Sequence, residues 1–316
     1  MNSRLKILRS AVGSMPSMGI IKEFLMADIE VIGIDSSPMS FGLYLLDKGY
    51  VIPRGDDPHF MEQFMTIVKK EKPDAILTSV EEEMLTLSKN KSVIENEGCL
   101  VLCPDYEYAE KCADKEKTNQ VFEELGIPIP KVYDIESSKF PCVIKPRFGR
   151  GGSGVTILKN KNHLDMILNE VKHPFIQEYV EGMEYTIDIL ADKEGNALSI
   201  VPRIRLGVES GISIKGRTVY NKEIMEYCSK IVKHLKLFGP SCIQCIEGEG
   251  GFKFLEINNR FGGGSIISIK ADPTIIPNLK KLIRGEKPQP SSGFKEDLIM
   301  LRNYSEIFLN RDELKI

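Results

Sequence analysis

The sequence lacks the features that mark membrane, secreted and nucleic-acid-binding proteins. No apolar run approaches the roughly 18 residues that a membrane-spanning helix needs. Arg4, Lys6 and Arg9 interrupt the apolar stretch at the N-terminus, so no signal peptide is evident and we expect a cytoplasmic protein. The net charge of -3 gives no sign of a nucleic-acid surface or a polybasic membrane anchor. We therefore expect neither nucleic acid nor membrane as a partner.

Paired cysteines and clustered histidines are also missing. The seven cysteines, an odd number scattered through apolar segments, indicate buried free thiols in a reducing compartment. Cys242 and Cys245 have C-x-x-C spacing, but no second pair completes a four-cysteine zinc site, and the four histidines fall at no ligand spacing. The segment also reads as a strand, where residues three apart face opposite sides. A metal or redox role for this pair is the weaker interpretation.

Residues 5–103 alternate between short apolar runs and helical patterns, which predicts βαβ units and a parallel sheet. A chain of 316 residues fits two or three domains. Asp35 stands roughly where a nicotinamide-binding domain carries its ribose acid, but residues 13–19 lack the G-x-G-x-x-G order, so hydride transfer is a minor alternative. The expected strands are 5–8, 30–35, 74–80 and 98–103, with helices up to residue 27, at 59–72 and at 81–96.

Charged residues open two of the expected helices. Glu81, Glu82 and Glu83 begin one, where carboxylates complement the helix dipole, and we favour this structural role. Asp114 suits the N-cap of a helix over 114–125, followed by Gly126 at C′ and a proline-rich entrance to a second domain. Lysines in the first turn oppose the dipole and invite an anion, so Lys115 has a functional reading, although most surface lysines have none.

A glycine-rich loop follows Lys145-Pro146. Glycine lets backbone N–H groups approach an anion closely, and the lysine and the loop arginines, Arg147 and Arg150, add positive charge. The pattern is typical of a lid over a polyphosphate, but on its own it fits a glycine-rich hairpin with solvated charges equally well.

Two strands around residues 247–251 predict an antiparallel hairpin. Reflection about the turn places Gln244 opposite Glu256, and Asn258 shares a face with Glu256. One carboxylate and two amide oxygens suit Mg²⁺, although a solvent-facing polar sheet gives the same pattern. Further elements are expected at 162–171 and 221–237 (helices), at 175–180, 184–190, 197–206 and 298–304 (strands) and at 207–217 (a charged loop).

Together these stretches resemble the ATP-grasp superfamily, in particular its carbamoyl phosphate synthetase large-subunit-like and biotin carboxylase-like ligases. The matching stretches are 114–115, 143–146, 149–154, 177–180 with Glu184, Gln244, and 256–260. The resemblance covers nearly the whole chain and implies an α/β and α+β protein. It implies an N-terminal Rossmann-like pre-ATP-grasp domain over 1–110, then an ATP-grasp small lobe over 111–185 and a large lobe with the metal site over 186–316.

The resemblance also implies roles for individual residues. ATP and Mg²⁺ would be the cofactors, with Mn²⁺ as an alternative metal. The catalytic residues would be Arg260, Lys145 and Arg205. Arg205 is the best candidate for binding a substrate carboxylate, but a role in a solvated charged face fits it equally well. Gln244, Glu256 and Asn258 would hold metal, although many relatives have an acid at the position of Gln244. The nucleotide would contact Lys115, Lys145, Gly149, Arg150, Gly151, Gly152, Ser153, Gly154, Gln177, Glu178, Tyr179, Val180 and Glu184.

The function implied is an ATP-dependent carboxylate–amine ligase acting on small molecules through an acylphosphate, with release of ADP and phosphate. The alternative is a nucleotide-binding, catalytically weak subunit or sensor of a split synthetase. A homodimer is one assembly open to such a chain. The synthesis of carbamoyl phosphate by this chain alone is not expected, because in the family that reaction uses two fused synthetase units and a glutaminase.

Overall fold

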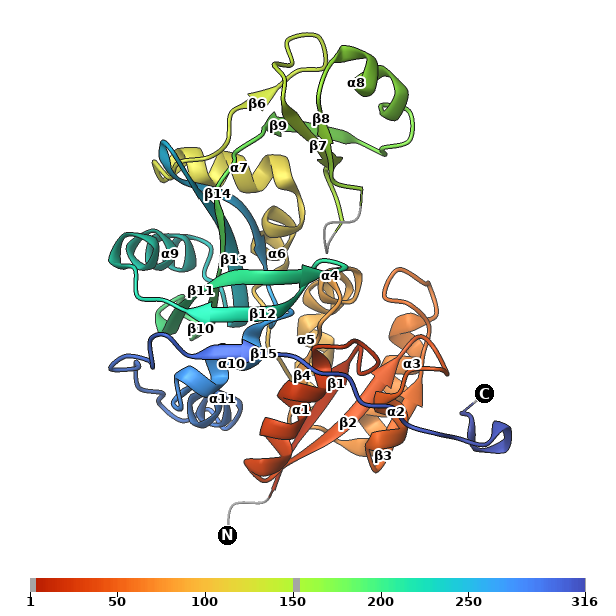
Figure 1. Cartoon of the computed structure of the whole chain (residues 1–316). Helices are drawn as coiled ribbons and strands as arrows, with labels where there is room; N and C mark the ends of the chain where they lie inside the picture. Colours follow the sequence, from red (N-terminus) through yellow and green to blue (C-terminus); the bar gives the residue numbers. More distant parts are fainter. Residues whose placement is uncertain (1–3, 150–153, 316) are drawn as a thin grey trace.

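Three β-sheets organise the protein (Figure 1) in a computed structural model that describes residues 4–149 and 154–315. The first has five parallel strands in the order β3-β2-β1-β4-β5, which confirms the predicted βαβ units. Its central strands are buried almost throughout, as expected where helices cover both faces. The strands are β1 (Leu5–Ser10), β2 (Ile29–Asp35), β3 (Lys48–Val51), β4 (Ala75–Leu77) and β5 (Leu100–Val101).

Helices connect these parallel strands. One helix over 81–96 was expected, and this is wrong: the chain breaks at Asn90, between α4 and α5. The Asn90 side chain donates to the Thr86 carbonyl at 2.8 Å, a local bond of the kind that competes with helix continuation. The connecting helices are α1 (Ser17–Met26), α2 (Gly42–Leu45), α3 (Phe60–Glu71), α4 (Glu81–Lys89) and α5 (Lys91–Glu95).

Two helices lead out of the parallel sheet, α6 (Tyr106–Ala113) and α7 (Lys115–Glu124). Asp114 caps α7 as predicted, because its carboxylate accepts from the backbone N–H groups of Glu116 and Lys117. Gly126 has a φ of 65°, the left-handed conformation expected just after a helix.

The second sheet is small and antiparallel, in the order β6-β9-β7-β8. With its helix it stands apart from the rest of the molecule at the top of Figure 1 and has its own core, which includes Cys142, Ile144 and Leu158. Its helix is shorter than the predicted 162–171. The elements are β6 (Val132–Tyr133), β7 (Cys142–Pro146), β8 (Thr156–Leu158), α8 (Lys161–Ile167) and β9 (Pro174–Glu178).

The third sheet has six antiparallel strands in the order β14-β13-β10-β11-β12-β15. One face packs on α9, and the other packs through Leu190 and Val201 into a core that also contains Ile20 and Phe24 of α1. This shared core joins the six-stranded sheet to the parallel sheet. The elements are β10 (Met183–Ala191), β11 (Ala197–Glu209), β12 (Ile212–Thr218), α9 (Lys222–His234), β13 (Gly239–Gly248), β14 (Gly251–Asn258), α10 (Ser265–Ala271), α11 (Ile275–Ile283) and β15 (Ile299–Leu301).

The loop expected at 207–217 is wrong, because β11 and β12 form a hairpin there. Its turn is Ser210-Gly211, and both residues have positive φ, 48° and 76°. Two such residues make the tight turn that matches the twist of paired strands. The charged residues of this segment hid the strand pattern.

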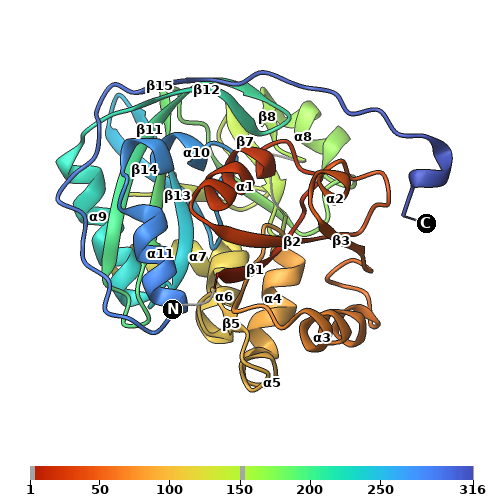
Figure 2. The same ribbon diagram turned by 90° about the horizontal axis from the view of Figure 1, so that it is seen from below.

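The chain ends by crossing back to the parallel sheet. Strand β15 pairs with β12, which confirms a final strand within the predicted range 298–304, although it is shorter than predicted. The following segment, with the short helix η1 (Arg311–Glu313), runs over the N-terminal part of the molecule in Figure 2. There the Lys315 ammonium donates to the carbonyls of Leu43 and Gly49 at 2.8 and 3.2 Å. None of the described helices is both long and apolar enough to cross a membrane.

Candidate active site

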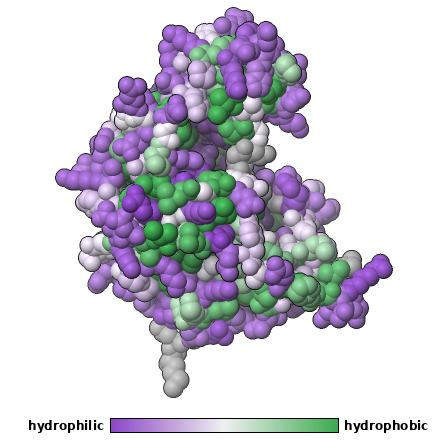
Figure 3. Space-filling view, in the orientation of Figure 1, coloured by the Kyte–Doolittle hydropathy of each residue, from purple (hydrophilic) through white to green (hydrophobic). Residues whose placement is uncertain are grey.

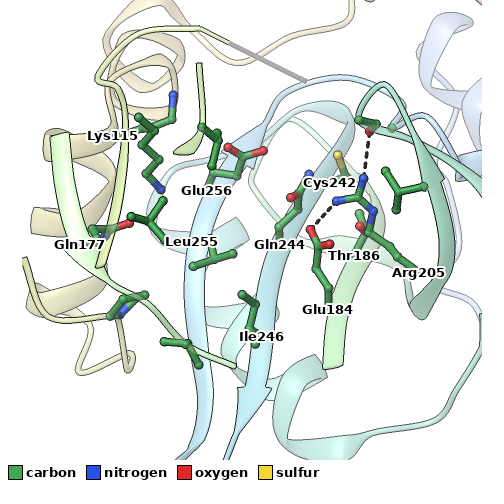
Figure 4. A pocket seen from close by; sticks show the side chains of 18 of the residues that line it. Lys115, Gln177, Glu184, Thr186, Arg205, Cys242, Gln244, Ile246, Leu255 and Glu256 are labelled. Atoms are coloured by element: carbon green, nitrogen blue, oxygen red, sulfur yellow. Dashed lines mark hydrogen bonds and ion pairs between the residues drawn. The ribbon is translucent and has the colours of Figure 1, made fainter. Parts of the chain in front are cut away.

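A cavity of about 470 Å³ lies between the four-stranded and six-stranded sheets. Figure 3 shows this region as a hollow below the upper sheet, and Figure 4 shows the side chains on its wall. Of the residues expected to bind nucleotide, metal or substrate, Asn258 and Gly154 are not on this wall, and Arg150, Gly151, Gly152 and Ser153 lie outside the described residues. The cavity brings together Lys115, Lys145, Gly149, Gln177, Glu178, Tyr179, Val180, Glu184, Arg205, Gln244, Glu256 and Arg260.

Two buried lysines supply positive charge at one end of the cavity. Lys145 on β7 is 7% exposed, and burial lowers the pKa of its ammonium to about 8, although the nearby Glu256 carboxylate opposes this shift. Lys115 opens α7, and its ammonium donates to the carbonyl of Gly149 at 2.9 Å. A buried ammonium without a carboxylate partner is costly, which favours an anion such as a phosphate between these groups.

Arg147 has a different role from the one that its place in the glycine-rich loop suggested. Its guanidinium donates to both carboxylate oxygens of Asp114, at 2.7 and 2.6 Å, and also pairs with Glu116. Burial opposes the ionisation of Asp114, but the hydrogen bonds from Arg147 and from the backbone outweigh it and hold the Asp114 pKa below its usual range. Arg147 therefore links the start of the glycine-rich loop to the N-terminus of α7 through these hydrogen bonds and ion pairs.

The opposite end of the cavity suits a flat, partly polar ring. Val143 and Ile157 of the four-stranded sheet and Ile246 and Leu255 of the six-stranded sheet all line the cavity. Gln177 is 2% exposed, and its amide Nε2 has no hydrogen-bond partner in the described part of the chain. An orphaned buried donor on a cavity wall is a mark of a ligand that the cavity accepts.

One backbone group of the expected adenine hinge is already engaged. The Glu178 N–H donates to the Lys131 carbonyl at 2.8 Å, where the chain leaves the linker for β6. The Glu178 N–H is thus not available to a base edge.

Glu184 and Arg205 form a salt bridge on the cavity wall (Figure 4). Arg205 also donates to the Gly211 carbonyl at 2.9 Å, which ties it to the turn of the β11–β12 hairpin. The structure thus gives Arg205 a partner within the chain, so its predicted binding of a substrate carboxylate stays a prediction.

Gln244 and Glu256 face each other across β13 and β14, as predicted. On the turn side of this pair Cys245 lies opposite Phe254, a register that would place Gln244 opposite Leu255. A bulge between Gln244 and Cys245 shifts the register by one residue and so brings Glu256 opposite Gln244. Asn258 donates to Glu256 Oε1 at 2.9 Å, and Arg260 donates to Asn258 Oδ1 at 3.0 Å. Glu256, Asn258 and Arg260 thus form one hydrogen-bonded line along the edge of the cavity.

This donor set fits Mg²⁺ carried by a phosphate. In the described ranges, no three His, Cys, Asp or Glu side chains cluster as they would in an all-protein metal cage. Mg²⁺ is commonly held by one or two carboxylates together with substrate phosphates and water. Glu256 with the amide oxygen of Gln244 matches that pattern, and Asn258 holds Glu256 in position.

The two cysteines with C-x-x-C spacing face opposite sides of β13, as expected. Cys242 lies on the cavity wall, whereas Cys245 lies in the core under α9. All seven cysteines are free and buried. The pair therefore offers neither a disulfide nor a shared metal site.

Arg203, which also lines the cavity, forms an ion pair with Asp188. Its guanidinium donates to Asp188 Oδ2 at 2.7 Å, and the hydroxyls of Ser265 and Ser268 donate to the same carboxylate. Arg203 is 2% exposed. This network stabilises the turn between Arg260 and α10. Arg203 therefore supports the cavity wall, and its charge is already paired with Asp188.

Glu81 belongs to this site, although the sequence favoured a structural role at the start of α4. Burial raises the pKa of its carboxyl group to about 7, while Lys115 and Arg260 lower it and Glu256 raises it further. These influences show that α4 carries Glu81 from the parallel sheet to the charged end of the cavity. No local pattern reveals this, because the contact depends on how the parallel sheet packs against the six-stranded one.

Comparison with known proteins agrees with the fold and the site. Residues 112–264 match the model of the ATP-grasp domain, and residues 15–102 match that of the PylC-like N-terminal domain. Residues 112–264 therefore form an ATP-grasp domain. This confirms the predicted superfamily for this part of the chain, and the structural likenesses reported below confirm the predicted fold.

Individual relatives are distant. The carbamoyl phosphate synthase large chain of Clostridium beijerinckii is 26% identical over 77% of this chain, and this chain spans about a quarter of its length. N5-carboxyaminoimidazole synthetase of Staphylococcus aureus, solved with ADP, has a TM-score of 0.74 at 15% identity, covering 93% of this chain and 81% of its own. The biotin carboxylase domain dimer of Hydrogenobacter thermophilus 2-oxoglutarate carboxylase, solved with MgADP and bicarbonate, gives 0.73 at 16% identity, covering 93% and 73%.

Proposed function

We propose that this protein is an ATP- and Mg²⁺-dependent carboxylate–amine ligase that acts on small molecules and releases ADP and phosphate. The observation that carries the proposal is the meeting of three kinds of group in one cavity. Lys115 and Lys145 supply charge for phosphates, Gln177 offers an unpartnered donor beside an apolar slot, and Gln244 faces Glu256 across the hairpin. That combination fits MgATP with its γ-phosphate directed toward Arg260.

The proposed first step is attack of a substrate carboxylate on the γ-phosphate, which forms an acylphosphate and releases ADP. Such a transfer needs alignment and charge neutralisation more than covalent help from the protein. Mg²⁺, held by Gln244 and Glu256, would neutralise charge on the phosphates. Lys145 and Lys115 would balance the remaining phosphate charge, and Arg260 would stabilise the transferring group.

In the proposed second step an amine attacks the acyl carbon. The C–N bond forms, the C–O bond to phosphate breaks, and phosphate leaves with the bonding electrons and takes up the proton that the nitrogen loses. Water would destroy the acylphosphate before the amine arrives, so the site must exclude it. The resemblance assigns this role to residues 149–154, of which Arg150, Gly151, Gly152 and Ser153 lie outside the described residues.

Roles for the remaining predicted residues follow from their positions. Glu184 would bind the ribose hydroxyls, and the salt bridge with Arg205 would orient its carboxylate. Arg205 would then face the substrate end of the cavity, together with the turn at Gly211. Glu178, Tyr179 and Val180 would contact the edge of the adenine ring, with Gln177 donating from the side.

A second candidate function is a nucleotide-binding, catalytically weak subunit or sensor of a split synthetase. Gln244 favours it, because an amide in place of an acid leaves the metal site with a single carboxylate. Lys115 and Lys145 would bind the phosphates of a nucleotide in either function, so turnover has to separate the two candidates.

The test is ADP formation with MgATP against a panel of small carboxylates, each with and without ammonium or a primary amine. The ligase predicts stimulation by one carboxylate and amine, lowered at least about 100-fold by Glu256→Ala. Glu249→Ala, in the exposed turn of the same hairpin, is the matched control and should retain full activity. If no pair stimulates ADP formation although MgATP binds, the result would favour the sensor.

A further inference from the structure

A second, much smaller cavity lies beside the large one, at the N-terminal end of α4. Its volume is about 10 Å³, which is room for one group the size of a water molecule. Glu81 lies on its wall, with Asn258 and Arg260 from the end of β14. The cavity is therefore formed where the helices of the parallel sheet meet the strand that carries the metal ligands.

Asn259 also lines this cavity and lacks a proper hydrogen-bond partner. It is 3% exposed, and neither its amide nitrogen nor its amide oxygen has a hydrogen bond in the described part of the chain. Its polar neighbour is the thiol of Cys112, which is a weak hydrogen-bonding group. A buried amide left in this way costs about 1–3 kcal/mol, so its place on a cavity wall indicates a bound polar group.

The charge of the missing group follows from Glu81. No lysine or arginine of the described residues forms a salt bridge with this partly buried carboxylate. Lys115 and Arg260 attract it from beyond salt-bridge distance, whereas Glu256 repels it. A water molecule would satisfy Asn259 but would leave Glu81 without a cation in direct contact. A small cation with N–H donors can donate hydrogen bonds to the amide oxygen of Asn259 and to the carboxylate of Glu81, and its charge pairs with that carboxylate.

We propose that this cavity binds the ammonium group of the amine substrate, with Glu81 and Asn259 as its recognition residues. The bound group would be ammonium or the protonated end of a primary amine, held beside Arg260, where the acylphosphate would form. The nitrogen would give one proton to the Glu81 carboxylate before it attacks the acyl carbon. This proposal rests on the proposed ligase function. The N-terminal part of the chain thus contributes the amine site, and the two lobes of the ATP-grasp fold contribute the site for ATP and carboxylate.

The site can be tested without any known carboxylate, by thermal unfolding of the full chain in the presence of MgADP. Ammonium chloride is compared at equal ionic strength with potassium chloride and with tetramethylammonium chloride, whose cation is too large for the cavity. We expect ammonium at 10 times its dissociation constant to raise Tm by roughly 2 °C or more, as mass action requires, and tetramethylammonium to have no such effect.

The variants are Glu81→Gln, which keeps the size and removes the charge, and Glu82→Gln, which makes the same change one residue along α4. Glu81→Gln should abolish the ammonium shift, whereas Glu82→Gln should retain it. Asn259→Leu provides a second test and should also weaken the shift. An unchanged shift in Glu81→Gln, or an equal shift with potassium in the wild type, would overturn the amine assignment.

A kinetic measurement separates this proposal from the proposed function. With ammonium as the amine, Glu81→Gln should raise the KM for ammonium at least 10-fold and leave the KM for MgATP unchanged. An active ligase whose ammonium KM does not respond to Glu81→Gln would refute the amine site and leave the ligase standing. A chain with the ammonium shift but without ligase activity would refute the ligase alone.

Discussion

Replacing Lys145 with methionine should stabilise the protein while removing its nucleotide binding. The Lys145 side chain is 7% exposed, and burial lowers the pKa of its ammonium from 10.5 to about 8. At 1.36 kcal/mol per pKa unit, this shift means that keeping the lysine charged costs the folded state up to about 3 kcal/mol at neutral pH. Methionine has a similar length and no charge, so Lys145→Met should recover a large part of that free energy of unfolding.

The pH dependence of this effect has a definite sign. The folded pKa of Lys145 lies below the unfolded one, so the folded state releases its proton first. The penalty is fully present below about pH 8 and disappears as the pH rises toward 10.5, where both states are neutral. The advantage of Lys145→Met should therefore be greatest at pH 7 and should shrink steadily between pH 8 and pH 10.5.

The assay is urea unfolding at pH 7 and pH 9.5, with and without MgADP. Lys139→Met, an exposed lysine near the same sheet, is the control and should change the free energy of unfolding by less than about 0.5 kcal/mol. MgADP should stabilise the wild type and Lys139→Met but not Lys145→Met. A loss of stability in Lys145→Met at pH 7, or a gain independent of pH, would refute the view that this ammonium is buried without compensation.

Three further predictions concern stability. Arg147→Ala should lower the free energy of unfolding, measured in urea at pH 7, by about 2–4 kcal/mol, because Asp114 loses its partner. This loss should shrink below pH 4, because the Asp114 carboxylate, whose pKa is lowered in the folded state, is then protonated. Gly264→Ala should cost about 1–3 kcal/mol in the same assay, since its Cβ would lie 2.6 Å from Arg203 Nη1. Lys72→Gly should raise Tm through a gain of about 0.5–1 kcal/mol, because Lys72 ends α3 with a φ of 49°.

Features set by short-range rules could be predicted from the sequence. The turn residues predicted the hairpin, but Gln244 lies opposite Glu256 only because a bulge just after Gln244 shifts the register that the turn sets by one residue. The cap of α7 by Asp114 followed from one side chain and the glycine after the helix. Both depend on residues close together in the chain.

Features that depend on packing between distant segments could not be predicted. Glu81 lies near Asn258 and Arg260 only because α6 packs against both α4 and β14 and so joins two sheets. The pairing of Glu184 with Arg205 depends on the register of β10 with β11, which no local turn reveals. Arg147 lies in a glycine-rich loop that is typical of phosphate binding, but its guanidinium forms hydrogen bonds with Asp114 instead.

The most direct test of the central claim is the fate of the carboxylate oxygen. A carboxylate found to stimulate ADP formation is labelled with ¹⁸O, and the phosphate released on amide formation is analysed by mass spectrometry. Attack on the γ-phosphate followed by loss of phosphate from the acyl carbon transfers one carboxylate oxygen to phosphate. The account predicts one ¹⁸O atom per phosphate with the fully labelled carboxylate. Unlabelled phosphate accompanied by amide formation would contradict it.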